Sequence, residues 1–224
     1  SRPAATANPH WLTTFNSTTL SVGDSLSLSF TYSSTDTTTQ ASGLRFGLYN
    51  SGGTSQSSDL PGGSVDALYQ DDVGYTLFAP RAASGNVQLY VKGTNATADI
   101  TDISTAANTA LAGTAAITGS TLGSASPTTF TATLQLTRTA SGYDYTSTWG
   151  GATLTASTTN VATSTFDTLE IFSFLGTSAQ VRIDDVLLTY TTASVPEPST
   201  YAAIAGSLGL VGAVSKRRLG RRGA

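Results

Sequence analysis

The sequence predicts an all-β protein in which two antiparallel sheets stack into a sandwich. Three observations lead to this fold class. Charged residues make up only 11% of the 224 residues, and Thr, Ser, Gly and Ala take their place, which is an unfavourable composition for long helices. Several segments alternate apolar and polar residues with a period of two, and Gly-rich turn signals separate them. Stacking two sheets buries the apolar faces of many such short strands.

The first elements follow from local alternation. Residues 1–12 are rich in Pro and Ala and are expected to be flexible. The Gly23-Asp24 turn then precedes the first clear strand segment. Four segments before residue 94 alternate as half-buried strands do: LSLSFTY at 26–32, LRFGLYN at 44–50, GYTLFAP at 74–80 and NVQLYVKG at 86–93.

The middle of the chain interrupts this pattern. In residues 94–127 the apolar residues are small and irregularly spaced, which predicts a long connection with one helical turn at the edge of the domain. Alternation returns at Phe130, and Ser141-Gly142 is a hairpin signal. The strand segments that complete the set are TLQLTRT (133–139), YDYTSTWGG (143–151), ATLTAST (152–158), TLEIFSFLG (168–176) and AQVRIDDVLLTYT (179–191). We therefore expect nine to eleven strands in one sandwich domain over residues 13–191.

The last strand segment carries a conflict of register. If Val181 and Ile183 face inward, Asp185 should face inward too, but Val186 and Leu188 require the opposite phase. A β-bulge between Ile183 and Val186 resolves the conflict and turns an Asp toward the rim.

Two Asp pairs are the candidate metal ligands. Asp71-Asp72 and Asp184-Asp185 offer hard carboxylate oxygens that suit Ca²⁺. Neighbouring residues of a strand point to opposite faces, so one pair does not chelate as a unit, and the alternative is a turn or capping role without metal. The absence of Cys and the presence of a single His exclude thiolate sites and a His pair for zinc.

The sandwich segment offers little for catalysis. Its one Glu, Glu170, is expected to face solvent on an amphipathic strand, whereas glycoside hydrolysis needs two carboxylates facing a cleft. The single His, His10, lies in the segment expected to be flexible and is not held for a Ser-His-Asp triad. We therefore expect no enzyme, and keep as an alternative a polysaccharide-active enzyme with an unrecognised carboxylate site.

Aromatic residues suggest a saccharide platform or a core. Tyr143, Tyr145 and Trp149 share one face of one strand. Such a stripe can stack on sugars, although cross-strand packing inside a protein is the more frequent role of aromatic residues.

The C-terminal segment differs from the rest. Val195, Pro196, Glu197 and Pro198 form an extended stretch within a linker at 192–200, because each Pro biases its predecessor to extended backbone. An uncharged run from Tyr201 to Val214 would span about 21 Å as a helix, short of the ~30 Å hydrocarbon core. The expected layout is a short membrane helix at 201–215 and a basic tail at 216–224. The basic residues of that tail are Lys216, Arg217, Arg218, Arg221 and Arg222.

This order of Pro-Glu-Pro, short apolar run and terminal Arg cluster resembles the PEP-CTERM sorting tail of Gram-negative bacteria. The resemblance implies export, transient retention in the inner membrane with the basic cluster as stop-transfer end, and cleavage by an exosortase-type membrane protease. It further implies release to the cell surface or extracellular matrix. The alternative is an ordinary single-pass anchor.

A second, looser resemblance concerns the sandwich. FDTLEIFSF, QVRIDDVLLTY and LRFGLYN are similar to strands of concanavalin/LamG-like jelly rolls. That resemblance implies a two-sheet jelly roll which in some members binds carbohydrate, with Ca²⁺ at the rim.

These expectations combine into one functional hypothesis. The chain is expected to be an exported envelope or biofilm-matrix protein with a structural or extracellular-polysaccharide-binding sandwich. A self-associating matrix protein is a further alternative. Residues 1–194 hold six basic and thirteen acidic residues, which argues against a nucleic-acid partner.

Overall fold

Eleven β-strands and no helix make up the residues that the computed structural model describes, which are 10–34, 43–54, 71–79, 84–93, 108–118, 128–149, 152–173 and 181–194. The strands are β1 (His10–Thr19), β2 (Ser25–Ser34), β3 (Leu44–Asn50), β4 (Val73–Ala79), β5 (Ser84–Lys92), β6 (Asn108–Thr118), β7 (Thr128–Arg138), β8 (Tyr143–Trp149), β9 (Ala152–Thr158), β10 (Thr165–Ser173) and β11 (Val181–Thr191).

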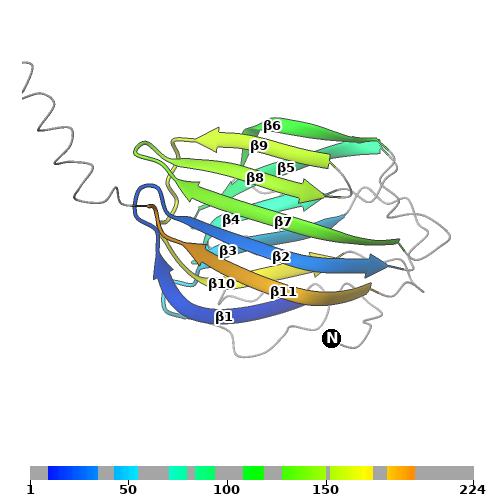
Figure 1. Ribbon diagram of the computed structural model, residues 1–224, viewed down its shortest axis with the longest axis horizontal. Coiled ribbons are helices and arrows are strands. Elements are labelled where there is room, and N and C mark those ends of the chain that lie inside the picture. Colours follow the sequence, from blue (N-terminus) through cyan, green and yellow to red (C-terminus); the bar gives the residue numbers. More distant parts are fainter. Residues whose placement is uncertain are drawn as a thin grey trace, which may run out of the picture. The chain divides into compact units, whose positions relative to one another are not determined.

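The strands form two antiparallel sheets that face each other (Figure 1). One sheet has six strands in the order β1-β10-β3-β4-β5-β6, and the other has five in the order β11-β2-β7-β8-β9. All pairings are antiparallel. The prediction of an all-β, two-sheet antiparallel sandwich is confirmed.

The core lies between the sheets and follows from the alternation in the sequence. On β2 the residues Leu26, Leu28, Phe30 and Tyr32 are buried, whereas the Ser and Thr residues between them are half-buried. Phe30 meets Phe46 of the opposite sheet edge to face, with ring centroids 5.0 Å apart. Burying a side chain of this size contributes about 1.5–3 kcal/mol.

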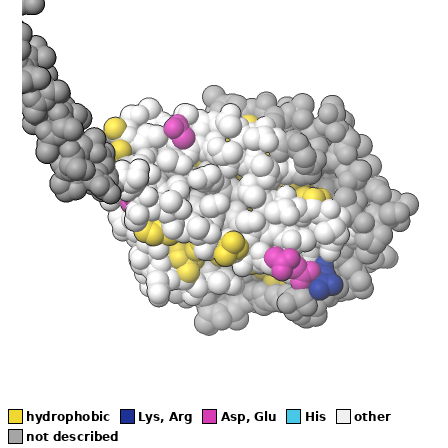
Figure 2. Space-filling model, in the orientation of Figure 1, with side chains coloured by type: hydrophobic (Ala, Val, Ile, Leu, Met, Phe, Trp, Pro, Cys, Tyr) yellow, Lys and Arg dark blue, Asp and Glu magenta, His cyan; other side chains and the backbone are white. Residues whose placement is uncertain are grey.

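The outer face of the five-stranded sheet is rich in hydroxyl groups. One row of cross-strand neighbours runs through Thr189, Ser27, Gln135, Thr146 and Thr155. Figure 2 shows this side of the molecule with few charged side chains. This face accounts for part of the high Thr and Ser content of the sequence.

Two segments expected to lack strands contain them. β1 begins at His10, inside the segment expected to be flexible, because it pairs with β10 over most of its length. β6 lies within the connection expected over 94–127, and β5 supplies its backbone partners. Neither strand has a strong alternation of its own, so pairing with a neighbour overrides weak local propensity.

The C-terminal predictions fall outside the described residues. The Pro-Glu-Pro signal, the apolar run and the basic cluster belong to residues 195–224. By its internal contacts the chain divides into two units, 1–192 and 193–224, and all eleven strands belong to the first. Within the described ranges, no helix has the length and apolar character needed to cross a membrane.

Candidate functional site

The outer face of the six-stranded sheet carries an ordered set of polar and aromatic side chains. Registers place them in rows of cross-strand neighbours. The first row is His10, Phe172, Arg45, Phe78 and Gln88, and the second is Leu12, Glu170, Gly47, Thr76 and Tyr90. We call these two rows and Tyr49 the outer-face cluster. It brings residues from both ends of the sequence onto one surface.

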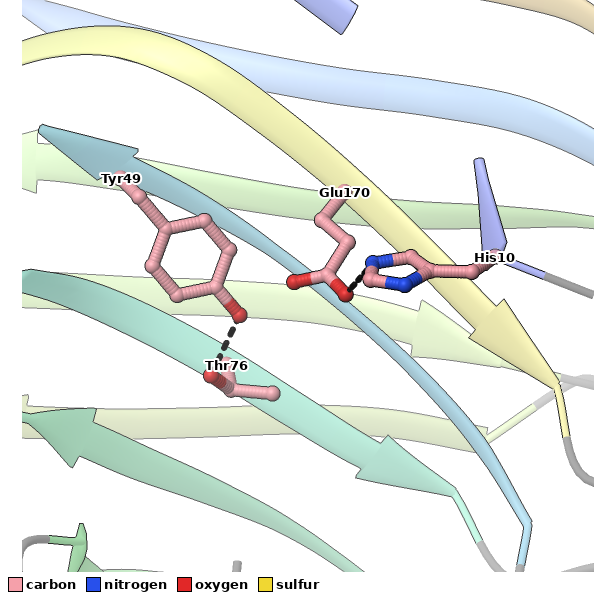
Figure 3. A network of polar contacts seen from close by, with 4 residues as sticks. All are labelled: His10, Tyr49, Thr76 and Glu170. Carbon is pink, nitrogen blue, oxygen red and sulfur yellow. Dashed lines mark hydrogen bonds and ion pairs between the residues drawn. The ribbon is translucent and has the colours of Figure 1, made fainter. Parts of the chain in front are cut away.

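His10 and Glu170 form a buried ion pair within this cluster (Figure 3). The contact joins His10 Nε2 to Glu170 Oε1, and the two residues are 4% and 1% exposed. The His10 ring also meets Phe172 edge to face at 5.6 Å. The predictions of a solvent-facing Glu170 and a flexible His10 are therefore wrong. Glu170 does point away from the core between the sheets, but this side of the strand is buried as well.

Tyr49 lies beside the ion pair and is held by a second polar contact (Figure 3). Its hydroxyl shares a hydrogen bond of 2.6 Å with Thr76 Oγ1. The ring needs the two glycines near it: a Cβ on Gly47 would lie 2.4 Å from Tyr49 Oη, and one on Gly74 would lie 2.7 Å from Tyr49 Cδ1. Both distances are too short for real atoms, so glycine at these positions creates the space that the tyrosine occupies.

Asp72 and Lys92 extend the polar groups toward the start of β4. Lys92 is fully buried, and its Nζ donates a hydrogen bond of 2.5 Å to the backbone carbonyl of Asp72. Burial raises the pKa of the Asp72 carboxyl to about 7, the positive charge of Lys92 lowers it, and the negative charges of Asp71 and Glu170 raise it further. A carboxyl that titrates near neutrality can exchange a proton at physiological pH.

Four residues of the outer face are only half-buried: Arg45, Phe78, Gln88 and Tyr90. The Arg45 guanidinium carbon lies 5.8 Å from the Phe78 ring centroid and 6.0 Å from that of Phe172. The Tyr90 hydroxyl donates a hydrogen bond of 3.1 Å to Gln88 Oε1. Sequence reasoning missed this group. The sequence does contain a signal for it. In the strand segments LRFGLYN, GYTLFAP and NVQLYVKG, several positions that alternate with the core positions carry planar side chains.

The predicted aromatic platform lies in the core instead. Tyr143, Tyr145 and Trp149 do share one face of β8, but each is at most 1% exposed. The Trp149 ring packs against Phe130 with centroids 4.1 Å apart, and Tyr143 and Tyr145 flank Tyr75. Burial also raises the pKa values of both tyrosines of this group. Their faces are not available to a sugar, so the carbohydrate role predicted for them is corrected to a packing role.

The predicted metal ligands do not assemble into a cluster. Asp71 is exposed and accepts a hydrogen bond of 3.1 Å from Thr54, whereas Asp72 is buried. Asp184 pairs with Arg182 at 2.5 Å, and Asp185 accepts from Thr31 at 3.3 Å. Among the described residues, no three His, Asp or Glu side chains come close enough to hold a metal ion. The Ca²⁺ site therefore stays a prediction, which no cluster of three such ligands supports within the described ranges.

The predicted bulge in β11 is confirmed. Its register with β2 shifts between Asp184, which pairs with Thr31, and Leu187, which pairs with Ser29. Asp185 adopts φ of +53°, in the left-handed region that few residues other than glycine enter. The bulge lets Ile183 and Leu188 both face inward and places Asp184 and Asp185 at the sandwich rim.

A cleft of about 580 Å³ opens beside this bulge, between β1, β10 and β11. Its walls are mainly apolar, with two carboxylates among them. The lining residues are Trp11, Thr13, Phe15, Leu169, Ile171, Ile183, Asp184, Asp185, Val186 and Leu188. No sequence pattern indicated it, because the lining comes from strands at both ends of the chain.

Comparison with known proteins identifies the fold. No family model and no curated protein matches the chain. The metal-free form of the Emp46p carbohydrate recognition domain is 17% identical over 86% of this chain and 82% of that one, with a TM-score of 0.52. A legume lectin-like domain from Entamoeba histolytica is 11% identical over 86% and 82%, with a TM-score of 0.48. A galectin from Cinachyrella sp. is 11% identical over 80% and 98%, with a TM-score of 0.42. At such identities the likeness concerns architecture, and the chain has the jelly-roll sandwich of lectin-like domains.

Proposed function

We propose that the chain is an exported envelope or extracellular-matrix protein whose sandwich binds polysaccharide through the outer face of the six-stranded sheet. The contact residues are Arg45, Phe78, Gln88 and Tyr90. The observation that carries the proposal is that these planar side chains are only half-buried and lie on adjacent strands of one sheet. A similarity in fold to a carbohydrate recognition domain supports the class of ligand.

Each member of the group has a role that suits a sugar. The Phe78 and Tyr90 rings offer apolar faces for the C–H side of a pyranose ring. The Arg45 guanidinium and the Gln88 amide offer donors in fixed directions for hydroxyl groups. The cation–π contact with Phe78 and the hydrogen bond between Tyr90 and Gln88 limit their rotamers before a ligand arrives.

Retention on immobilised extracellular polysaccharide from the bacterium that makes the protein tests this role. We expect Phe78→Ala and Gln88→Ala each to weaken retention about tenfold, a typical cost for a contact residue of about 1.4 kcal/mol. Thr155→Ala, an exposed change on the other sheet, is the matched control and should leave retention unchanged. Equal retention of all three variants, with unchanged melting temperatures, would show that the outer face does not bind the polysaccharide.

The C-terminal segment supplies the export half of the proposal. We infer that Val195, Pro196, Glu197 and Pro198 are the recognition element for an exosortase-type protease in the inner membrane. The basic residues from Lys216 onward then act as the stop-transfer end. The support is the sequence order of extended motif, short apolar run and basic cluster. The intact mass of the protein recovered from culture medium tests it. Loss of about 25–30 residues, enough for a membrane segment with flanks, is expected.

A second candidate function is polysaccharide cleavage. The observation that favours it is a carboxyl with a pKa raised to about 7, at Asp72, on the same sheet as the Glu170–His10 pair. The burial of all three side chains argues against cleavage, because a polysaccharide cannot reach them in this conformation. Release of reducing ends from the polysaccharide by the parent protein, abolished in Asp72→Asn, would establish the enzyme. Retention without any release supports the binding module.

A further inference from the structure

We propose that the cleft between β1, β10 and β11 binds a small amphiphile with an apolar body and one positive charge. The cleft lies along the edge of the sandwich where β1 and β11 are the outermost strands of their sheets. At the opposite edge β6 and β9 lie against each other. The volume of about 580 Å³ falls within the range of small-molecule sites.

The walls of the cleft are suited to an apolar body. Trp11 and Phe15 come from β1 and Leu169 and Ile171 from β10, while β11 contributes its own aliphatic residues on the other side. Trp11 and Ile171 are buried parts of the core, so the walls are fixed by packing before any ligand enters. Val186 at the mouth is exposed and would lose contact with water when the cleft fills.

Charge at the mouth determines which amphiphile fits. Asp184 and Asp185 both line the cleft, and Arg182 neutralises only one of them, which leaves one net negative charge. Asp184 binds Arg182 through Oδ2, whereas its Oδ1 is buried and accepts no hydrogen bond within the described part of the chain. An ammonium group at the mouth would supply the opposite charge. A carboxylate at the same place would meet repulsion instead.

The backbone holds this arrangement at a cost. Asp185 stays at φ +53°, in the left-handed region that most residues with a side chain avoid and that Asp and Asn tolerate best. The bulge that needs this conformation brings a second carboxylate to the cleft and turns Leu188 back toward the interior. Strained backbone of this kind often accompanies a binding site.

Three probes of equal chain length separate charge from hydrophobicity: octylammonium, octanoate and octanol. We expect calorimetry on the full chain to show octylammonium binding at least tenfold more tightly than octanoate, with octanol between them. The change in tryptophan emission on binding should disappear in Trp11→Phe while calorimetric binding remains, which places the ligand at β1. Equal affinities for the three probes, or no binding of octylammonium, would overturn the proposal.

Substitutions at the mouth test the assigned carboxylates. Asp185→Asn removes the charge and keeps a residue that tolerates the left-handed region, so the bulge should persist. The preference for octylammonium over octanoate should fall at least fivefold in Asp185→Asn and in Asp184→Asn. Asp144→Asn makes the same charge change at an exposed position on β8 and should keep the preference. A loss of equal size in Asp144→Asn would show a general charge effect and reject the site.

Discussion

His10 in β1 and Glu170 in β10 are joined by a buried ion pair on the outer face of the six-stranded sheet. The two residues are diagonal neighbours, since His10 pairs with Phe172 and Glu170 with Leu12. The contact therefore fixes the register of the edge strand β1 at its N-terminal end. An edge strand held by a specific polar contact is less prone to slip by a residue pair than one held by backbone bonds alone.

Removing one partner of this pair should strongly destabilise the fold. We expect Glu170→Leu or His10→Leu to lower the free energy of unfolding by about 3–5 kcal/mol, because the remaining buried residue loses its ionic contact. The double variant should lose less than the sum of the two. Urea unfolding of the four proteins measures the coupling. Strictly additive losses would mean that the contact contributes nothing of its own.

Asp72 should make the folded state less stable as the pH rises toward 7. Its folded pKa of about 7 lies above the ordinary 3.8, so the folded state holds a proton that the unfolded state releases. Its favourable contribution is complete below pH 3.8 and is lost as the pH rises through 7. We expect Asp72→Asn to be more stable than the parent above pH 7, by up to about 4 kcal/mol.

The measurement for Asp72 is urea unfolding at several pH values from 4 to 9. The difference between Asp72→Asn and the parent should grow with pH and level off above about 7. Asp144→Asn removes an exposed carboxylate on the other sheet and serves as the matched control. A difference for Asp72→Asn that does not change with pH would contradict the raised pKa.

The sequence was sufficient to predict the fold class and the bulge in β11. Alternation in β2 correctly identified the inward side chains, and the clash of phases around Asp185 located the bulge. Such patterns are local, so they can be read without the rest of the chain.

The polar sites could not be predicted from the sequence, because they depend on long-range structure. Glu170 faces away from the core, as its phase predicts, but the sequence does not say which face of a sheet is also covered. Its partner His10 is 160 residues away, and their proximity is a property of strand order. The same holds for the cleft, since Trp11 and Ile183 line it together only because β1 and β11 lie at the same edge of the sandwich.

Gly47 should tolerate no side chain. A Cβ there would lie 2.4 Å from both Tyr49 Oη and the backbone carbonyl of Tyr75, so both the ring and the strand would have to move. We expect Gly47→Ala to cost about 1–3 kcal/mol and to break the hydrogen bond between Tyr49 and Thr76. Gly53→Ala is a useful comparison: a Cβ there meets no atom, and only the positive φ resists the change.

Thermal unfolding of the two alanine variants separates crowding from backbone strain. Gly53→Ala should lower stability by about 1 kcal/mol through conformation alone. The loss in Gly47→Ala should be larger. Were Gly53→Ala the more damaging of the two, the close approach of the Tyr49 ring to Gly47 would be refuted.

The bulge residue Asp185 should respond to the shape of its replacement. Asp185→Gly relieves the positive φ but loses the 3.3 Å hydrogen bond from Thr31, so we expect a change within about 1 kcal/mol. Asp185→Val adds a β-branched side chain in the left-handed region and should cost about 1–3 kcal/mol. Denaturant midpoints of the two variants give the answer, and equal stability of Gly and Val would show that the bulge is not strained.

Trp149 and Phe78 should separate folding from ligand binding. Trp149 packs in the core against Phe130 and Tyr32, so Trp149→Ala should lower the free energy of unfolding by about 3–5 kcal/mol. Phe78 is half-buried on the outer face, and Phe78→Ala should cost less stability but weaken polysaccharide retention.

The milder Trp149→Phe keeps a ring in the core and is the variant for the binding assay. With retention normalised to the folded fraction, Trp149→Phe should equal the parent, because no sugar reaches a side chain that is 1% exposed. Retention lost in Trp149→Phe but kept in Phe78→Ala would reverse the assignment, and would mean that the ligand enters between the sheets instead of resting on the outer face.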